Sequence, residues 1–426
     1  MTSAPARDPG PAPPEVQLRI LKVLVFSQAL GGAGMAAGIT VGALLAQDLL
    51  GSTGLAGLPV ALFAAGAAAG ALGAGQISQR WGRRPGLALG HATAAVGSVG
   101  VVAAATARTV PLLLFSLFVY GAGTATNLLA RYAGADLAAP EERGRATGTV
   151  LLATTLGAVA GPGLAGPTGA VAHAWDLPRL TGPFLLAVVA YTAAALVLAL
   201  WLRPDPLLLA RERQSGQATE SGGRRGHSGG AGVVAGAAVM VTGQLVMIAV
   251  MTMTPVHMTG HGHSTQAAGL VIALHVGAMF LPSPLTGLLV DRVGRLPVAT
   301  ASGGVLLAAG VLAALAPPTG TAGTVLLAAA LVLLGVGWNL GLVSGSALVT
   351  DAAAPEARAA TQGLVDVGMA IAGATGGMVS GLVVAGSGYR WLALCAGVVA
   401  LAVIPLVARA SQSRSYGAPS LSRSTV

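Results

Sequence analysis

Long apolar stretches constrain this 426-residue chain more than any other feature. A helix needs about 20 consecutive apolar residues to cross the hydrocarbon core of a bilayer. Twelve stretches of about that length lie near residues 20–45, 54–76, 86–106, 110–132, 146–168, 181–202, 232–256, 265–290, 296–316, 320–343, 360–386 and 388–409. The sequence therefore predicts an all-α membrane protein with twelve transmembrane helices.

The charge content supports this class and excludes others. Charged residues make up only 9% of the chain, against roughly 25% in ordinary globular proteins. The net charge of +9 does not indicate a nucleic-acid partner, because the arginines lie in short loops and aromatic residues make up only 4%. Cys395 is the one cysteine, so a disulfide within the chain and a cysteine metal cluster are excluded.

Arginines are concentrated in alternate loops, and this bias predicts the orientation. The opposite set of loops holds only Arg108, Arg179 and Arg390. Cytoplasmic loops of membrane proteins carry the excess of positive charge. We therefore expect a multi-pass protein of the cytoplasmic (inner) membrane with both termini in the cytoplasm.

One polar segment divides the predicted spans into six and six. Residues 203–231 are rich in Gly, Ser, Gln and Arg, which is the composition of a flexible linker. The predicted organisation is a disordered cytoplasmic tail (1–19), an N-terminal six-helix bundle (20–202), a cytoplasmic linker (203–231), a C-terminal six-helix bundle (232–409) and a second cytoplasmic tail (410–426). Two equivalent halves are typical of secondary transporters.

Two pairs of loops repeat between these halves. Residues 75–83 and 287–295 share the pattern Gly-x-x-x-x-Arg-x-Gly-Arg, after the second and eighth spans. Residues 135–143 and 350–358 share an aspartate followed by Pro-Glu-x-Arg, after the fourth and tenth spans. The repeats indicate halves that separate and close around paired contacts, which argues against a receptor or a channel.

The first pair of loops resembles the inter-helix loop signature of the major facilitator superfamily. The residues that carry it are Arg80, Gly82, Arg83 and Arg84 in the first half and Asp291, Arg292, Gly294 and Arg295 in the second. The resemblance covers residues 20 to 409. It implies two bundles around a central cavity, alternating access, and a loop that latches the halves on the cytoplasmic side. Gln79 replaces the aspartate of the signature, so the first latch should be weaker or rearranged. The alternative is that these arginines only fix the topology.

The fifth span contains a second motif of the same superfamily. Gly157, Gly161 and Pro162 resemble its antiporter motif, although Ala165 replaces the last glycine. That resemblance implies proton-coupled exchange. Small residues and proline also serve helix packing and bending, so a simple packing helix is the alternative.

Methionines and histidines gather on the seventh and eighth spans. Residues four apart share one helix face, and the set that could converge in the bundle is Met247, Met251, His275 and Met279. Thioether and imidazole ligands suit Cu(I). A second set could collect the ion at the outer mouth: His257, Met258, His261 and His263. Methionine is also a common packing residue, whereas an ionisable residue at mid-span, such as His275, is usually functional.

This pattern resembles the CcoA-like copper importers of the superfamily, a branch that is similar to riboflavin importers. The resemblance implies that Met247, Met251, His275 and Met279 bind the metal. Two functions stay open: Cu(I) import, and proton-coupled transport of an organic molecule, either riboflavin-like uptake or drug efflux.

A few polar residues lie inside the predicted spans. Asp366 is the candidate proton carrier, or a structural partner of an inner-loop arginine. Arg131 could pair with Asp136 or with a substrate anion, or extend to the membrane surface. The candidates to line the cavity, or to tie helices together, are Asn127, Arg131, Asn339 and Gln362.

No pattern for enzyme chemistry occurs in a suitable context. We therefore expect a protein that is not an enzyme, has no cofactor, and acts as a monomer. Its partners would be a small solute or metal ion and the lipid bilayer.

Overall fold

The computed structural model describes residues 14–50, 57–220 and 229–405, and every regular element in them is helical. The α-helices are α1 (Pro14–Leu50), α2 (Gly57–Trp81), α3 (Arg83–Thr106), α4 (Val110–Thr124), α5 (Thr126–Ala135), α6 (Arg143–Ala174), α7 (Gly182–Trp201), α8 (Pro206–Glu220), α9 (Gly229–Gly260), α10 (Thr265–Phe280), α11 (Ser283–Val293), α12 (Arg295–Leu315), α13 (Gly320–Ala352), α14 (Arg358–Ser387) and α15 (Tyr389–Ala400). Two short 3-10 helices, Pro140–Glu142 and Arg179–Thr181, precede α6 and α7.

The helices account for the predicted spans. Among the described residues, ten helical segments are long and apolar enough to cross a membrane, and Tyr389–Pro405 is a shorter apolar one. Helix α6 covers the fifth predicted span. The fourth and eighth spans each consist of two helices, α4 with α5 and α10 with α11, and Pro282 and Pro284 mark the second break. The all-α membrane fold is confirmed.

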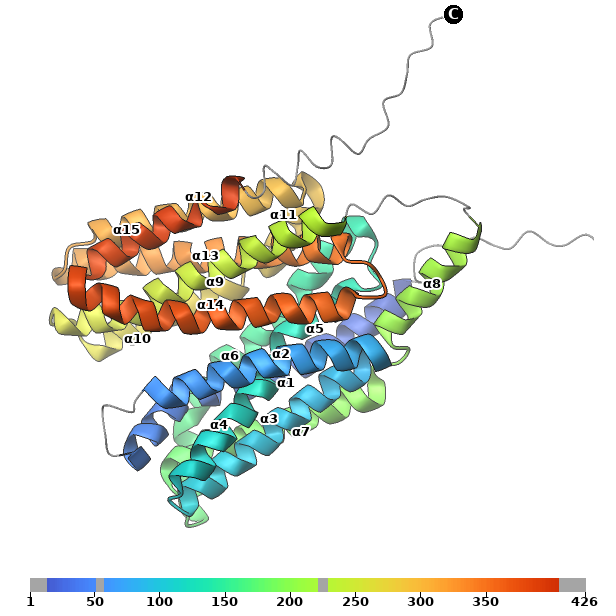
Figure 1. Ribbon diagram of the computed structural model, residues 1–426. Helices are drawn as coiled ribbons and strands as arrows, with labels where there is room; N and C mark the ends of the chain where they lie inside the picture. The colour runs from blue at the N-terminus through green and yellow to red at the C-terminus, as the bar shows by residue number, and fades with distance from the viewer. Residues whose placement is uncertain (1–13, 51–56, 221–228, 406–426) are drawn as a thin grey trace, which may run out of the picture.

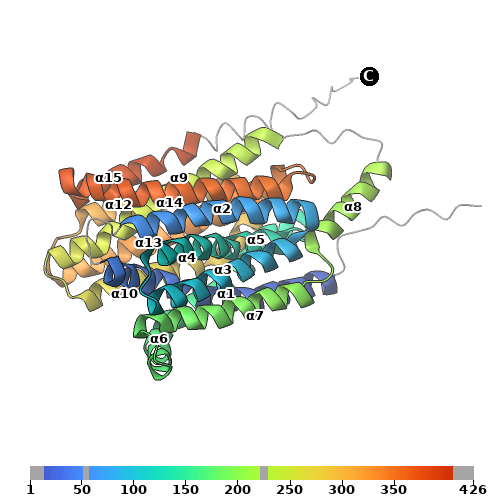
Figure 2. The ribbon, with the colours of Figure 1, turned by 60° about the horizontal axis from the view of Figure 1, so that its bottom comes forward.

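The helices form two bundles, α1–α7 and α9–α15, which lie against each other (Figure 1). Helix α2 packs against α14 and α6 packs against α11, so these pairs join the halves. The bundles converge near α5 and α8 and diverge toward the ends of α4 and α10 (Figure 1). Helix α1 begins at the converging end and α15 runs toward it, so we call this end the termini side (Figures 1 and 2).

Two boundaries differ from the prediction. Helix α1 begins at Pro14 rather than at residue 20, and Gln17 Nε2 donates to the carbonyl of Gly134 at 2.9 Å. A flexible linker over 203–231 is wrong for its first part, which forms α8. Leu207 and Ala210 are buried and the side chain of Asp205 accepts the Leu207 amide at 3.0 Å, so α8 has both an apolar face and an N-terminal cap. Residues 1–13 and 410–426 of the predicted tails lie outside the described residues.

The repeated loops have the same backbone shape. Gly82 and Gly294 have φ of +96° and +103°, in the left-handed region that favours glycine. Each residue directly precedes a helix, α3 or α12, and makes the sharp turn into it. Both copies of the repeat therefore have a glycine where the backbone takes the left-handed conformation.

Candidate functional site: the contacts between the halves

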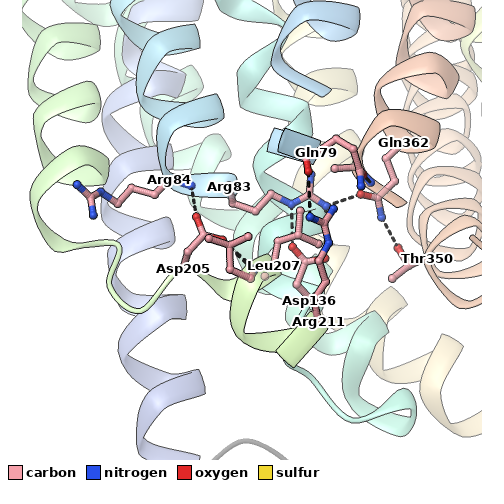
Figure 3. Close-up of polar contacts among 12 residues, drawn as sticks. Gln79, Arg83, Arg84, Asp136, Asp205, Leu207, Arg211, Thr350 and Gln362 are labelled. Carbon is pink, nitrogen blue, oxygen red and sulfur yellow. Dashed lines mark hydrogen bonds and ion pairs between the residues drawn. The ribbon is translucent and has the colours of Figure 1, made fainter. Parts of the chain in front are cut away.

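The loop of the first half is bound to the start of α14 in the second half. Gln79 Oε1 accepts the backbone amides of Ala359 and Ala360 at 2.9 and 3.3 Å, and its Nε2 donates to the carbonyl of Glu356. The first amides of a helix have no partner within the helix. Gln79 therefore supplies a side-chain cap across the interface, and we call this contact the first latch (Figure 3).

The loop of the second half makes the equivalent contact with α6 in the first half. Asp291 accepts the amides of Gly144 and Arg145 at 2.9 and 2.8 Å, one on each carboxylate oxygen. These amides lie in the first turn of α6, as those bound by Gln79 lie in the first turn of α14. We call this contact the second latch. The amide of Gln79 thus retains the geometry of the aspartate and loses its charge.

Glycines allow the helices at each latch to touch through their backbones. A Cβ atom on Gly287 of α11 would lie 2.2 Å from the Gly144 carbonyl oxygen. At the first latch, a Cβ atom on Gly363 of α14 would lie 2.7 Å from the Ala71 carbonyl oxygen. The helix pairs α6–α11 and α2–α14 correspond in the repeat, although these two glycines do not, and a larger residue at either would push the halves apart.

A buried ion pair supports the first latch. Arg83 Nε lies 2.7 Å from Asp136 Oδ2, and both side chains are fully buried. Arg83 Nη2 also donates to Gln362 Oε1 of the second half, and Gln362 Nε2 donates to Thr350 Oγ1 at 3.0 Å. Arg83 is therefore a buried link between the halves, as Figure 3 shows.

The corresponding charges at the second latch are more exposed. Asp351 binds Arg295 of its own half at 3.0 Å and Arg143 of the other half. The side chain of Asp351 is 21% exposed, against none for Asp136. Both aspartates come from the repeated loops noted in the sequence, where no pattern separated the buried one from the exposed one.

A further, fully buried arginine forms an ion pair between the halves. Arg131 of α5 binds both carboxylate oxygens of Asp366 of α14, at 2.7 and 3.2 Å. Its Nε donates to Ser346 Oγ at 2.8 Å, and Nη2 donates to Tyr132 Oη at 2.9 Å. Arg131 is completely buried. The expected pairing with Asp136 is wrong, because Asp136 is bound by Arg83, and the side chain does not extend to the surface.

Helix α8 adds contacts that the sequence analysis missed. Asp205 accepts the backbone amide of Arg84 at 2.8 Å (Figure 3). Arg211 Nη1 donates to the Gln79 carbonyl at 2.9 Å, and its Nε donates to the Pro355 carbonyl at 3.3 Å. Helix α8 therefore touches both partners of the first latch. The available signal was Asp205 followed directly by proline and leucines, a pattern typical of a helix start.

Comparison with known proteins agrees with this architecture. The family model of the Major Facilitator Superfamily matches residues 24–341 and 236–423. The chain belongs to the major facilitator superfamily. It is 51% identical over 396 residues to the uncharacterized MFS-type transporter YdeG of Bacillus subtilis (strain 168), covering 91% of each chain.

Two more distant similarities are informative. The riboflavin transporter RfnT of Brucella anthropi is 32% identical over 398 residues, which is 92% of this chain and 96% of that one. The solved structure of the proton:xylose symporter XylE superposes with a TM-score of 0.71 at 17% identity, covering 93% of this chain and 96% of that one. The protein is therefore a membrane transporter of a small solute, and not an enzyme.

The superfamily fold places the methionine and histidine candidates in the second half. His275 is fully buried; its Nδ1 lies 2.7 Å from the Leu331 carbonyl of α13, and its Nε2 has no partner. Met247 and Met279 belong to one buried core, with Met251 at its edge. Helix α10 packs chiefly against α13 rather than against α9. Among the described residues, no group of three His, Cys, Asp or Glu side chains could hold a metal. Convergence of these four residues stays a prediction.

The outer histidines divide into two groups. The ring of His257 stacks on Tyr389, with centroids 4.4 Å apart, and lies 4.3 Å from the ring of His261. Both nitrogens of His263 contact a different loop and helix, the Pro318 carbonyl and Thr324 Oγ1, at 3.0 Å each. Met258 is completely buried. His263, through its contacts, and Met258, through its burial, are therefore separate from the neighbouring rings of His257 and His261.

The remaining candidates lie within their halves. Asn127 Nδ2 donates to Tyr191 Oη at 3.2 Å, and Asn339 Nδ2 donates to Ser283 Oγ at 2.7 Å, so both tie helices together. A Cβ atom on Gly157 would lie 2.1 Å from the Ala29 carbonyl oxygen, which shows close packing of α6 on α1. Two further predicted residues, Gly161 and Pro162, lie in α6, but their surroundings lie outside the described residues. Arg80 and Arg292 are exposed at the latches.

Proposed function

We propose that this protein is a secondary active importer of a neutral, planar organic solute of the riboflavin type, working by alternating access. The observation that carries alternating access is the one-sided placement of the contacts between the halves. Both latches and both glycine crossings lie at the termini side, while the bundles diverge toward the other end (Figure 1). This is the arrangement expected of a transporter closed on one side.

The charges inside the molecule favour a neutral solute. Arg83 and Arg131 are the fully buried arginines of the first bundle at the interface between the halves, and each binds a carboxylate of this chain. Binding an anion there would first require breaking a buried ion pair, which costs several kcal/mol. Similarity to the riboflavin transporter over nearly the whole chain supports a neutral heterocycle.

The same ion pair bears on Asp366. Both its oxygens accept hydrogen bonds from Arg131, so the carboxylate is already engaged across the interface. We therefore assign Asp366 to holding α5 and α14 together in this state, and place the proton elsewhere. The transporter acts as a monomer in the cytoplasmic membrane, with the termini side in the cytoplasm; the arginine distribution supports that orientation.

Cu(I) import is the second candidate, and one observation favours it. His275 Nε2 is buried without a partner, one helical turn from Met279 on the same helix. A buried nitrogen without a hydrogen bond is rare and calls for an explanation. A soft metal ion held by His275, Met279, Met247 and Met251 would supply one.

Uptake measurements separate the two candidates. Cells that lack their own riboflavin uptake would express either the wild type or the double variant His275→Gln/Met279→Leu, at equal membrane expression. We expect uptake of radiolabelled riboflavin above the empty vector in both, collapsed by a protonophore.

The copper arm uses the same cells with radioactive copper under reducing conditions. Copper uptake that the double variant loses, without any riboflavin uptake, would replace the first proposal by the second. Uptake of neither compound above the empty vector would contradict both proposals.

A further inference from the structure

A second polar cluster lies inside the first bundle, away from both latches and from the methionines. His91 of α3 is completely buried. Its Nδ1 lies 2.9 Å from the Leu87 carbonyl, and its Nε2 is buried with no hydrogen-bond partner. Because a carbonyl only accepts, Nδ1 carries the hydrogen. In a neutral ring, Nε2 is therefore an unpaired acceptor in a buried place.

The group beside this lone pair is a second unpartnered acceptor. A Cβ atom on Gly31 of α1 would lie 3.0 Å from His91 Nε2 and 2.2 Å from Asn127 Oδ1, so both atoms point to one place on α1. Asn127 Oδ1 is buried with no partner, because the amide's Nδ2 donates to Tyr191 Oη at 3.2 Å. Two acceptors facing each other leave both unsatisfied, which is costly in a buried site.

One proton would satisfy both groups. A proton added to His91 Nε2 makes it a donor, and Asn127 Oδ1 is the acceptor that it would meet. Loss of the proton can also be accommodated. Rotation of the Asn127 amide by half a turn lets its NH2 donate to the neutral ring, while Tyr191 Oη donates to the oxygen. The amide orientation in this structure is the one that a protonated His91 selects.

The neighbours of His91 bring no competing charge to the cluster. Gly31 faces it from α1, Asn127 from α5 and the ring of Tyr191 from α7, with centroids 5.8 Å apart. From α4, Tyr120 reaches Tyr191 and donates to the Gly34 carbonyl of α1 at 2.6 Å. These groups are all uncharged at neutral pH.

Charged groups on the surrounding helices are paired or remote. Arg83, two turns before His91 on α3, is bound by Asp136. Arg131, one turn after Asn127 on α5, is bound by Asp366. The charged residue of α2, Arg80, is exposed at the end of that helix. The buried arginines of α3 and α5 are therefore each held by a carboxylate.

We infer that His91, with Asn127 and Tyr191, is the proton-binding site that couples transport to the proton gradient. The inference rests on the proposed solute transport and names its coupling ion. The cluster also connects to the moving parts. Gln28 of α1 donates to the Asn127 carbonyl and to Thr154 Oγ1 of α6, and α6 is the helix that the second latch caps. A change at the cluster therefore acts on the pair α1 and α6.

The test compares two modes of transport in proteoliposomes with radiolabelled riboflavin as the probe. The variants are His91→Gln and His173→Gln, the latter an exposed histidine in the same half. Exchange of riboflavin across the membrane needs no net proton movement, whereas accumulation driven by a pH gradient does. We expect His91→Gln to keep exchange and lose accumulation, and His173→Gln to keep both. Wild-type accumulation should increase as the outer pH falls, because a lower outer pH supplies more of the coupling ion.

A direct measurement keeps the inference separable from the choice of solute. Nitrogen-15 NMR of histidine-labelled protein in detergent distinguishes a neutral ring with hydrogen on Nδ1 from the doubly protonated ring. The resonance missing from His91→Gln should convert between these two forms as the pH is lowered over the range in which the protein stays folded. If His91→Gln does not fold, Asn127→Leu should shift the same resonance, because it removes the acceptor of the Nε2 proton.

The outcomes are distinct. Failure of wild-type exchange would contradict riboflavin transport and leave the NMR result to decide on the proton site. Accumulation by His91→Gln at the wild-type level, or a resonance that stays neutral throughout the pH range, would overturn the inference.

Discussion

At the termini side, Gln79 and Asp291 each close the first turn of a helix that belongs to the other half. The first latch uses a neutral amide and the second a carboxylate, in matching geometry. A carboxylate at a helix N-terminus gains about 0.3–1 kcal/mol from the helix dipole. Hydrogen bonds to a charged group contribute about 1.5–3 kcal/mol, against about 1 kcal/mol for neutral ones. Direct capping is therefore stronger at the second latch.

The surroundings compensate for that difference. The first latch is supported by the fully buried Arg83–Asp136 pair and by α8 through Arg211. The second latch has partly exposed pairs around Asp351 and no counterpart of α8 among the described residues. One latch thus depends on charge at the surface and the other on burial. The comparison teaches that two copies of a repeated loop can keep the same hydrogen-bond geometry while one is stabilised by charge and the other by burial.

The largest loss of stability is expected at the Arg131–Asp366 ion pair, where the two halves carry different residues at the equivalent position. Arg131 corresponds to Ser346 in the second half, and the two side chains touch. Arg131→Leu leaves the carboxylate of Asp366 buried without a counter-charge, which costs about 3–5 kcal/mol. We expect a large loss of thermal stability in detergent, measured by thermal unfolding of the purified protein. Ser346→Ala removes the hydrogen bond from Arg131 and a weak one to Met240 Sδ, and should cost about 1 kcal/mol. Equal unfolding temperatures for the two variants would show that the pair does not hold the halves.

The next largest effect is expected where glycines let helices of the two halves touch. Replacing these glycines by alanine should separate the halves by different amounts at the two latches. Gly287→Ala places a Cβ atom 2.2 Å from a backbone oxygen of α6. At the equivalent Gly75, the nearest atom would be 2.9 Å away. Overpacking costs about 1–3 kcal/mol, so Gly287→Ala should open the second latch further than Gly75→Ala opens the first.

Matched spin labels can measure both latches in one background. Cys395→Ser removes the native, exposed cysteine. Cysteines at the exposed positions 80 and 357 report on the first latch, and at the equivalent positions 292 and 142 on the second. Gly287→Ala should lengthen the 292–142 distance. If Gly75→Ala lengthens the 80–357 distance as much, the crossings are equivalent and the asymmetry lies elsewhere.

The sequence predicts the arrangement of helices better than it predicts which side chains contact each other. Apolar length predicts twelve spans and the placement of arginines predicts the orientation, because the bilayer imposes both. The repeated loops follow from matching residues in the two halves. The partner of Arg131 was wrong because Asp366 lies 235 positions away, and helix rotation, which decides such contacts, leaves no local signal. His91 was overlooked for the same reason: a single histidine in an apolar helix gains its meaning from Asn127 and Gly31 on other helices. Helix α8 was missed because its polar composition outweighed the signal of Asp205.

Salt should separate the latches in the wild type. Surface charges are screened within about 10 Å at 0.1 M salt and about 3 Å at 1 M. Asp291 is partly exposed, so the 292–142 distance distribution should broaden toward longer values as salt rises, while the 80–357 distribution stays constant. Asp291→Asn should weaken the second latch by about 1 kcal/mol and abolish its salt response. An unchanged salt response in that variant would assign it to Asp351 instead.

The smallest effect is also the sharpest test of the comparison. Gln79→Glu gives the first latch a carboxylate, as at the second. The charge gains about 0.3–1 kcal/mol at the start of α14, but the lost Nε2 hydrogen bond to the Glu356 carbonyl removes about as much. We therefore expect little change in unfolding temperature and a new salt response of the 80–357 distance. A first latch that stays insensitive to salt would show that burial around Arg83, rather than the capping group, decides how each latch responds.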